Sequence, residues 1–236
     1  MTAEFDKHAA TYDGGLDNPI KRLMGNSPDQ FIAVKARWLL RREKALRGGE
    51  LSLLDYGCGA GDLMRVLAGL GARAAFSGCD VSTGMLAEAA KRWPGELGAA
   101  PSLAAQDGPR TPFPDGQFDI ATVSAVLHHV PLAERPAVYA ELGRVLKPGG
   151  RLYVFEHNPR NPLVRHVIAR TPIDQHAILL DANEVQAGLL DSARYEVETD
   201  YLMFMPPGIK FLRSIDRALA WLPLGAQYAV AARKPA

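Results

Sequence analysis

The stretch LLDYGCGAGD, residues 53–62, decides the fold of this chain. An apolar run ends at Asp55, and Gly57, Gly59 and Gly61 separate it from an amphipathic helical pattern over residues 62–70. Glycines permit a tight turn and a close backbone approach to a ligand, and the start of a helix offers unpaired N–H groups. The stretch therefore predicts a strand, a ligand-binding turn and a helix, in that order.

Outward from this stretch, short apolar runs alternate with helical patterns, which is typical of βαβ units and a parallel sheet in an α/β fold. We expect strands over residues 51–55, 74–79, 102–106, 118–124, 151–156, 195–203 and 227–233. We expect helices around residues 62–70, 83–91, 132–146 and 183–190, and another between residues 208 and 222.

The pattern of apolar residues divides the chain into two parts. Residues 1–48 are helical in pattern, with Phe31, Val34 and Trp38 on one face. Residues 49–236 are expected to form the main domain, with an irregular insertion near residues 157–193 instead of a second domain.

Composition excludes several classes of protein. With 27 Lys+Arg against 26 Asp+Glu, the chain lacks the basic excess of a nucleic-acid-binding protein. A hydrophobic fraction of 47% with 22% charged residues is typical of a folded domain and not of a disordered chain. Cys58 and Cys79 lack the spacing of a zinc site and are too few for a disulfide framework, so we expect no metal and a reducing compartment.

Neither a secretory signal nor a membrane span is expected. The opening MTAEFDKHAATYD has no basic region followed by an apolar run. The longest weakly polar stretch, residues 218–232, is interrupted by Pro223 and Gly225 and is shorter than the roughly 20 residues that a spanning helix needs. We therefore expect a soluble, cytoplasmic protein.

Charge around the glycine turn indicates the kind of ligand. A dinucleotide-binding turn favours Gly or Ala where Asp62 stands, because a pyrophosphate sits against the helix start. Here Asp55 and Asp62 bracket the turn with carboxylates, which repel a pyrophosphate but suit a ligand with an ammonium and a sulfonium. S-adenosylmethionine is such a ligand.

Two further acidic residues follow the next strands. Asp80 stands where a carboxylate can accept hydrogen bonds from ribose hydroxyls, and Asp107 could accept one from the adenine amino group. Each has a structural alternative: Asp55 as a turn former, Asp80 as a helix N-cap, and Asp107 as a turn residue before Gly108. Together with the glycine turn, the three carboxylates favour a nucleoside site.

Five motifs extend this interpretation over nearly the whole chain. They are FDKHAATYD (5–13), LLDYGCGAG (53–61), CDVS (79–82), FPDGQFDIATVSAVLHHV (113–130) and LKPGGRLYV (146–154). With them the chain resembles the class I S-adenosylmethionine-dependent methyltransferases, and most closely their ubiquinone/menaquinone-type (methyltransferase type 11-like) small-molecule branch. The resemblance implies a Rossmann-like three-layer sandwich, with a seven-stranded, mostly parallel sheet that has one antiparallel strand.

The resemblance also implies roles for single residues. Asp55, Gly57 and Gly59 would hold the methionine end of S-adenosylmethionine, and Ser124 with His129 would lie near its sulfur. Tyr12 would belong to a helical N-terminal lid, which we expect to close over the cofactor together with the helix bearing Trp38. The full expected cofactor set is Tyr12, Asp55, Gly57, Gly59, Asp80, Val81, Met85, Gln106, Asp107, Gly108, Ser124 and His129.

Methyl transfer is an in-line displacement, so alignment and exclusion of water are the main tasks, and a general base is optional. The favoured base is His157, because it follows the fifth predicted strand and should face the crevice. His129 is the second catalytic candidate, although the His128-His129 pair could equally be a cap or a pocket wall. The remaining candidate bases are His176, Glu156 and Tyr228.

The acceptor is expected to be a small molecule, hydrophobic or anionic, with O-, C- and N-methylation all open. Arg160, Arg165 and Arg170 could bind an anionic group, but an exposed charged helix explains them equally well. The apolar segment 201–212 fits a core, a dimer surface or a pocket wall, so both monomer and homodimer remain open. The alternatives are a nicotinamide-dependent oxidoreductase and a non-catalytic S-adenosylmethionine-binding module.

Overall fold

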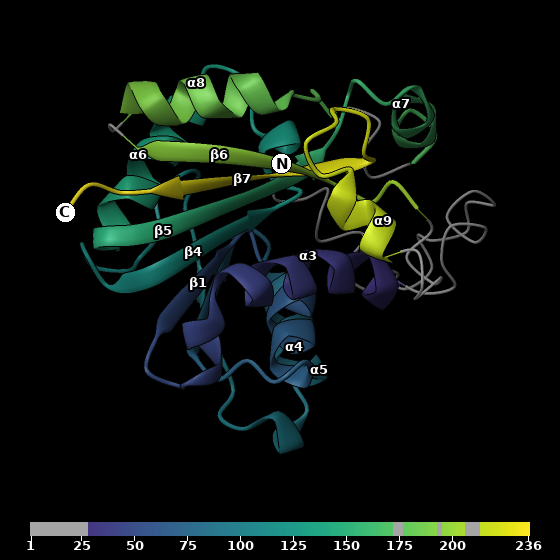
Figure 1. The fold of residues 1–236 in the computed structure, drawn as a ribbon. Helices are drawn as coiled ribbons and strands as arrows, with labels where there is room; N and C mark the ends of the chain where they lie inside the picture. The colour runs from purple at the N-terminus through teal and green to yellow at the C-terminus, as the bar shows by residue number, and fades with distance from the viewer. Residues whose placement is uncertain (1–27, 172–176, 193–194, 206–212) are drawn as a thin grey trace.

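A seven-stranded sheet forms the centre of the computed structural model, which describes residues 28–171, 177–192, 195–205 and 213–236 (Figure 1). The strand order is β3-β2-β1-β4-β5-β7-β6. Strand β7 runs antiparallel to both of its neighbours, while the other pairs are parallel. The strands are β1 (Ser52–Tyr56), β2 (Ala75–Asp80), β3 (Ser102–Ala105), β4 (Phe118–Ser124), β5 (Leu146–His157), β6 (Glu196–Leu202) and β7 (Gln227–Arg233).

Helices cover both faces of the sheet, which gives three layers (Figure 1). On one face lie α3 (Pro28–Arg42), α4 (Asp62–Gly69) and α5 (Thr83–Arg92); on the other lie α6 (Arg135–Val145) and α8 (Ala182–Ser192). The shorter helices are α7 (Pro162–Ile168), α9 (Arg213–Ala218), η2 (Lys44–Arg47), η3 (Gly95–Leu97) and η4 (Leu127–His129). The predicted three-layer α/β fold is confirmed.

Strand β1 shows why the sheet needs both helical layers. Successive side chains of a strand point to opposite faces. Leu53 packs in the core beneath α3 and α4, and Leu54 packs in the core beneath α6 and α8; both are fully buried. An apolar run without alternation therefore forms a strand that is covered on both sides.

The order of the strands fixes where a ligand can bind. Strand β1 lies between β2 and β4, so the chain reverses its direction across the sheet at this point. In open α/β sheets the crevice beyond the carboxyl ends of the strands at such a switch point is the usual ligand site. The glycine turn after β1 lies at this position.

Several elements differ from the sequence-based expectation. Strand β5 begins at Leu146 and includes His157, which was expected to follow the strand. The β4–β5 register shifts between Phe118 and Ile120, which accommodates the early start. The region expected to be an irregular insertion contains α7 in addition to α8, which was expected over residues 183–190. Within the described residues, no helix is long and apolar enough to cross a membrane.

Helix α3 belongs to the core and does not act only as a cover. Trp38 is buried, and its ring meets Tyr153 and Phe155 edge-on at centroid distances of 5.7 and 5.6 Å. Its Nε1–H donates to Asp200 Oδ2 at 2.8 Å. Trp38 therefore anchors α3 on the sheet, and the expected closure of this helix over the cofactor stays a prediction. Tyr12 lies outside the described residues, and the lid of residues 1–48 stays a prediction.

The Trp38→Ala substitution should lower the free energy of unfolding by about 3 to 5 kcal/mol, the range for deleting a large buried aromatic side chain. Trp221, which is 74% exposed, provides the matched control, and its substitution by Ala should change stability by less than about 0.5 kcal/mol. Urea unfolding of the three proteins measures both effects. Equal losses in the two variants would contradict the core position of α3.

Candidate active site

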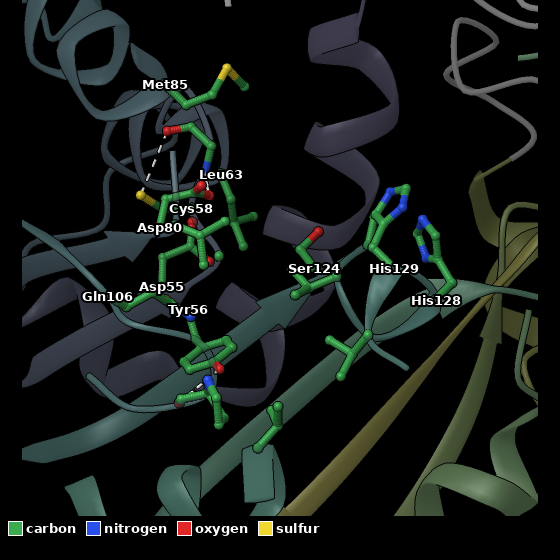
Figure 2. Close-up of a pocket in the computed structure, with 18 of the residues that line it drawn as sticks. Asp55, Tyr56, Cys58, Leu63, Asp80, Met85, Gln106, Ser124, His128 and His129 are labelled. Atoms are coloured by element: carbon green, nitrogen blue, oxygen red, sulfur yellow. Dashed lines mark hydrogen bonds between the residues drawn. The ribbon is translucent and has the colours of Figure 1, made fainter. Parts of the chain in front are cut away.

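A cavity of about 460 Å³ opens beyond the carboxyl ends of β1, β2, β4 and β5, which is within the usual size range of small-molecule sites. Figure 2 shows Ser124 between two groups of lining residues, with Asp55 and Asp80 on one side and His128 and His129 on the other. The cavity therefore joins the turns after the first two strands to the histidines that follow β4.

Most of the predicted site residues line this cavity. They are Asp55, Gly57, Gly59, Asp80, Val81, Met85, Gln106, Gly108, Ser124, His129 and His157. Asp107 is exposed and does not line it, and Tyr12 lies outside the described residues. The sequence thus predicted a set of residues that the fold brings together from five separate segments.

Gly57 of the turn lies against Val126, with no room for a side chain between them. Gly57 has φ 68°, and a Cβ on it would lie 2.6 Å from Val126 Cγ2. Such a close approach would force the Val126 side chain to move, and the positive φ disfavours any residue with a Cβ. Gly57 is therefore required both by the conformation of the turn and by the wall opposite it.

Asp80 holds the turn in place. One carboxylate oxygen accepts the Gly59 N–H at 2.9 Å, and the other accepts the Ser82 N–H at 2.9 Å. Ser82, not Asp80, is the N-cap of α5, because its side chain accepts from Met85 N at 3.1 Å. A carboxylate oxygen can accept more than one hydrogen bond, so Asp80 can brace the turn and still receive ligand hydroxyls.

Asp55 lies at the end of β1 with almost no exposed surface. Its Oδ1 accepts a hydrogen bond from Thr122 Oγ1 at 2.8 Å. Burial raises the pKa of Asp55 from its usual value of 3.8 to about 7, although the Thr122 bond and the nearby Lys35 ammonium both lower it. A cationic ligand group in the cavity would favour the ionised form of this carboxyl.

Gln106 supplies the polar group at the far end of the cavity. Its Nε2–H donates to Gly108 O at 2.9 Å, while its buried Oε1 finds no hydrogen-bond partner among the described residues. Asp107 forms a tight backbone bridge with Arg110, with N···O distances of 3.2 and 3.1 Å. The turn role considered for Asp107 is the one that the structure shows, and a contact with adenine stays a prediction.

Glu156 organises the histidine side of the cavity. It is fully buried, and Oε1 accepts N–H groups from Val126 at 3.0 Å and Leu127 at 2.7 Å. His128 Nδ1 lies 2.6 Å from Oε2. Burial alone would raise the pKa of Glu156, but the His128 contact and the neighbouring His157 lower it to about 2. Because an ionised carboxylate only accepts, Nδ1 of His128 carries the proton.

Two features of the site were missed by sequence reasoning. Lys35 of α3 lines the cavity with its Nζ 2.9 Å from Ser124 Oγ. Its signal was a lysine between Ile32 and Leu39 on the apolar face of the helix. Ala125 also lines the cavity and has φ 58°, a strained conformation for a residue with a Cβ. No local sequence pattern predicts this positive φ at Ala125.

Comparisons with known proteins agree with this geometry. Residues 54–154 match the family model described as a methyltransferase domain. A 2-phytyl-1,4-naphtoquinone methyltransferase from Synechococcus elongatus is 39% identical over 158 residues, which cover 64% of this chain and 66% of the relative. A demethylmenaquinone methyltransferase from Parafrankia is 40% identical over 171 residues, which cover 66% of this chain and 62% of the relative. The alignments thus span slightly less than two thirds of these relatives.

Solved structures support the same fold. A SAM-dependent methyltransferase from Archaeoglobus fulgidus has a TM-score of 0.63 to this chain, with 15% sequence identity and coverage of 89% of this chain and 96% of that one. At this level of identity the likeness shows the fold alone. The resemblance to class I methyltransferases that the sequence motifs indicate is confirmed.

The position of Asp55 predicts how stability depends on pH. Its pKa is higher in the folded chain than in the unfolded chain, so its contribution is fully present below about pH 4 and is lost as the pH rises through about 7. The Asp55→Asn substitution removes this loss. Relative to wild type, the variant should gain up to about 4 kcal/mol between about pH 4 and about pH 8, at about 1.4 kcal/mol per pKa unit. Urea unfolding without ligand measures it, and a pH-independent difference would contradict the buried carboxyl.

Proposed function

We propose that this chain, whose residues 54–154 belong to the methyltransferase domain family, transfers a methyl group from S-adenosylmethionine to a small-molecule acceptor. The observation that carries the proposal is the joint position of the glycine turn, Asp80 and Gln106 in one cavity at the switch point of the sheet. The glycine turn suits the charged amino-acid part of such a cofactor, the Asp80 carboxylate suits its ribose, and the Gln106 amide suits its adenine.

The groups that line the cavity suit the parts of the cofactor. Because Gly57 and Gly59 have no side chains, the backbone of the turn can approach the methionine end closely, and Asp80 can accept the two ribose hydroxyls. The Oε1 of Gln106 has no hydrogen-bond partner among the described residues, and it is better placed than the exposed Asp107 to accept the adenine amino hydrogen. When bound, S-adenosylmethionine supplies an electrophilic methyl group on its sulfonium.

The acceptor that we propose is a hydrophobic small molecule, with a quinol-type ring as the leading candidate. The names of the relatives refer to naphtoquinone and demethylmenaquinone substrates. The cavity agrees with a flat apolar ring, because Ile32, Val126, Val130 and Val138 contribute apolar side chains to its wall. These walls also exclude water from the displacement, which favours reaction with the acceptor over hydrolysis.

We propose His157 as the base that takes a proton from a hydroxyl or an acidic carbon of the acceptor. It lines the cavity at the end of β5, and its ring lies 5.3 Å from that of His128 by centroids. His128 is held by Glu156 and is 4.2 Å from His129 by ring centroids, so the three imidazoles share one side of the cavity. The buried Glu156 carboxylate favours positive charge on this side.

Two alternatives remain distinguishable by simple measurements. The family match and the relatives favour a methyltransferase over a nicotinamide-dependent oxidoreductase. Stabilisation of the protein against heat by S-adenosylhomocysteine but not by NAD would support the proposal, and the opposite pattern would overturn it. Transfer of labelled methyl groups from S-adenosylmethionine to a naphthoquinol would separate an enzyme from a non-catalytic binding module.

Asp80→Ala should weaken the binding of S-adenosylhomocysteine by about 1 to 3 kcal/mol, because the ribose hydroxyls lose a charged acceptor. Asp80→Asn should have a milder effect, since one acceptor oxygen remains. Asp115→Ala, at an exposed residue of the Arg144 ion pair, serves as the control. If calorimetry gives Asp80→Ala the wild-type affinity, the ribose role is wrong.

His157→Ala should lower the single-turnover rate about 10²- to 10⁴-fold without changing cofactor affinity, if proton removal limits the reaction. The pH–rate profile of the variant should lose the inflection that His157 causes. His166→Ala, at an exposed histidine of α7, is the control and should keep the wild-type rate. A His157 variant with the wild-type rate and profile would assign this residue to packing and make His129 the next candidate.

A further inference from the structure

Lys35 is a buried cation in the cavity to which the proposed reaction assigns no role. The residue is 5% exposed, and it is the only Lys or Arg among the described residues that line the cavity. Within the described part of the chain its ammonium makes one hydrogen bond, to Ser124 Oγ at 2.9 Å. An ammonium has three N–H donors, so two of them have no partner among the described residues and can serve a ligand in the cavity.

The neighbouring carboxylates stabilise the charge of Lys35 without pairing with it directly. Asp55 and Glu156 both favour the ammonium form, while burial lowers its pKa to about 8. The oxygens of Glu156 already receive hydrogen bonds from Val126, Leu127 and His128, and Asp55 Oδ1 receives one from Thr122. Lys35 has no direct anionic partner among the described residues. Because an ammonium removed from water without one is costly, its position points to a partner that arrives with the ligand.

The position of Lys35 identifies the part of the ligand that it can reach. Its partner Ser124 lies between the Asp55–Asp80 group and the histidine pair (Figure 2). Asp80 and Gln106, which we assign to the nucleoside, lie on the side of Ser124 away from the histidines (Figure 2). Lys35 therefore lies beyond the nucleoside, where the amino-acid end of the cofactor begins.

We propose that Lys35 binds the carboxylate of the amino-acid end of S-adenosylmethionine, and that with Asp55 it forms a matched pair of charges for the zwitterion. This assignment rests on the proposed function. The cofactor has a single carboxylate, and the described residues give the cavity a single lysine to receive it. The ammonium of the same amino-acid end is then left for the Asp55 side, where a cation favours the ionised carboxyl.

Helix α3 holds Lys35 in a fixed position. Lys35 is on the same helix as Trp38, which anchors that helix in the core. The carboxylate is therefore bound from a rigid element and not from a mobile loop, which holds the sulfur end of the cofactor in one position for in-line attack.

The test compares two ligands that differ only in the carboxylate: S-adenosylhomocysteine and its decarboxylated analogue. Calorimetry on the full chain should show that wild type prefers S-adenosylhomocysteine about 10- to 100-fold, the range for one charged hydrogen bond. Lys35→Met should lose this preference, because its affinity for S-adenosylhomocysteine falls while that for the analogue does not. Lys44→Met, at an exposed lysine just after α3, should keep the wild-type preference.

Other outcomes would overturn the assignment. If Lys35→Met keeps the preference, or if Lys35→Arg loses it as completely as Lys35→Met, Lys35 does not act as the carboxylate's cation. If Lys35→Met keeps the preference but binds the anion of 2-hydroxy-1,4-naphthoquinone more weakly, the lysine belongs to the acceptor site instead. Failure of wild type to bind S-adenosylhomocysteine at all would contradict the proposed function, and this assignment with it. Melting temperatures of the variants show whether each is folded.

Discussion

The carboxylate of Asp80 ties the first two βα turns of the sheet together. It accepts one N–H from the glycine turn after β1 and one from the turn that starts α5, both at 2.9 Å. Glycine tolerates the positive φ values of this turn, and the bond from Gly59 N–H to Asp80 holds the turn against the end of β2. The shape of the cavity next to β1 and β2 depends on these two bonds.

A second buried carboxylate plays the same part on the other side of the switch point. Glu156, at the end of β5, holds the segment after β4 through the backbone of Val126 and Leu127 and orients His128. Val126 is also the residue that approaches Gly57, so the two carboxylates act on opposite walls of one cavity. Between them, Lys35 and Asp55 supply one buried cation and one buried acid.

The sequence predicted the parts of the structure that depend on local pattern. The alternation of apolar runs and helices predicted the sheet, and the spacing of acidic residues after strands predicted Asp55 and Asp80 in the cavity. Asp107 was harder, because an exposed turn and a ligand contact have the same local sequence. Lys35 and Ser124 are 89 positions apart in the sequence, and His128 and Glu156 are 28 positions apart. Only the fold brings the two residues of each pair together. Periodicity showed that Trp38 lies on an apolar face of its helix, but not that this face meets Tyr153 and Phe155.

The most direct test of the central claim is a crystal structure of the chain with S-adenosylhomocysteine. The account predicts the adenine next to Gln106, the ribose hydroxyls on Asp80, and the carboxylate of the amino-acid end within hydrogen-bond distance of Lys35 Nζ. A ligand bound outside this cavity, or one bound inside it with the adenine at the histidine side, would contradict the account.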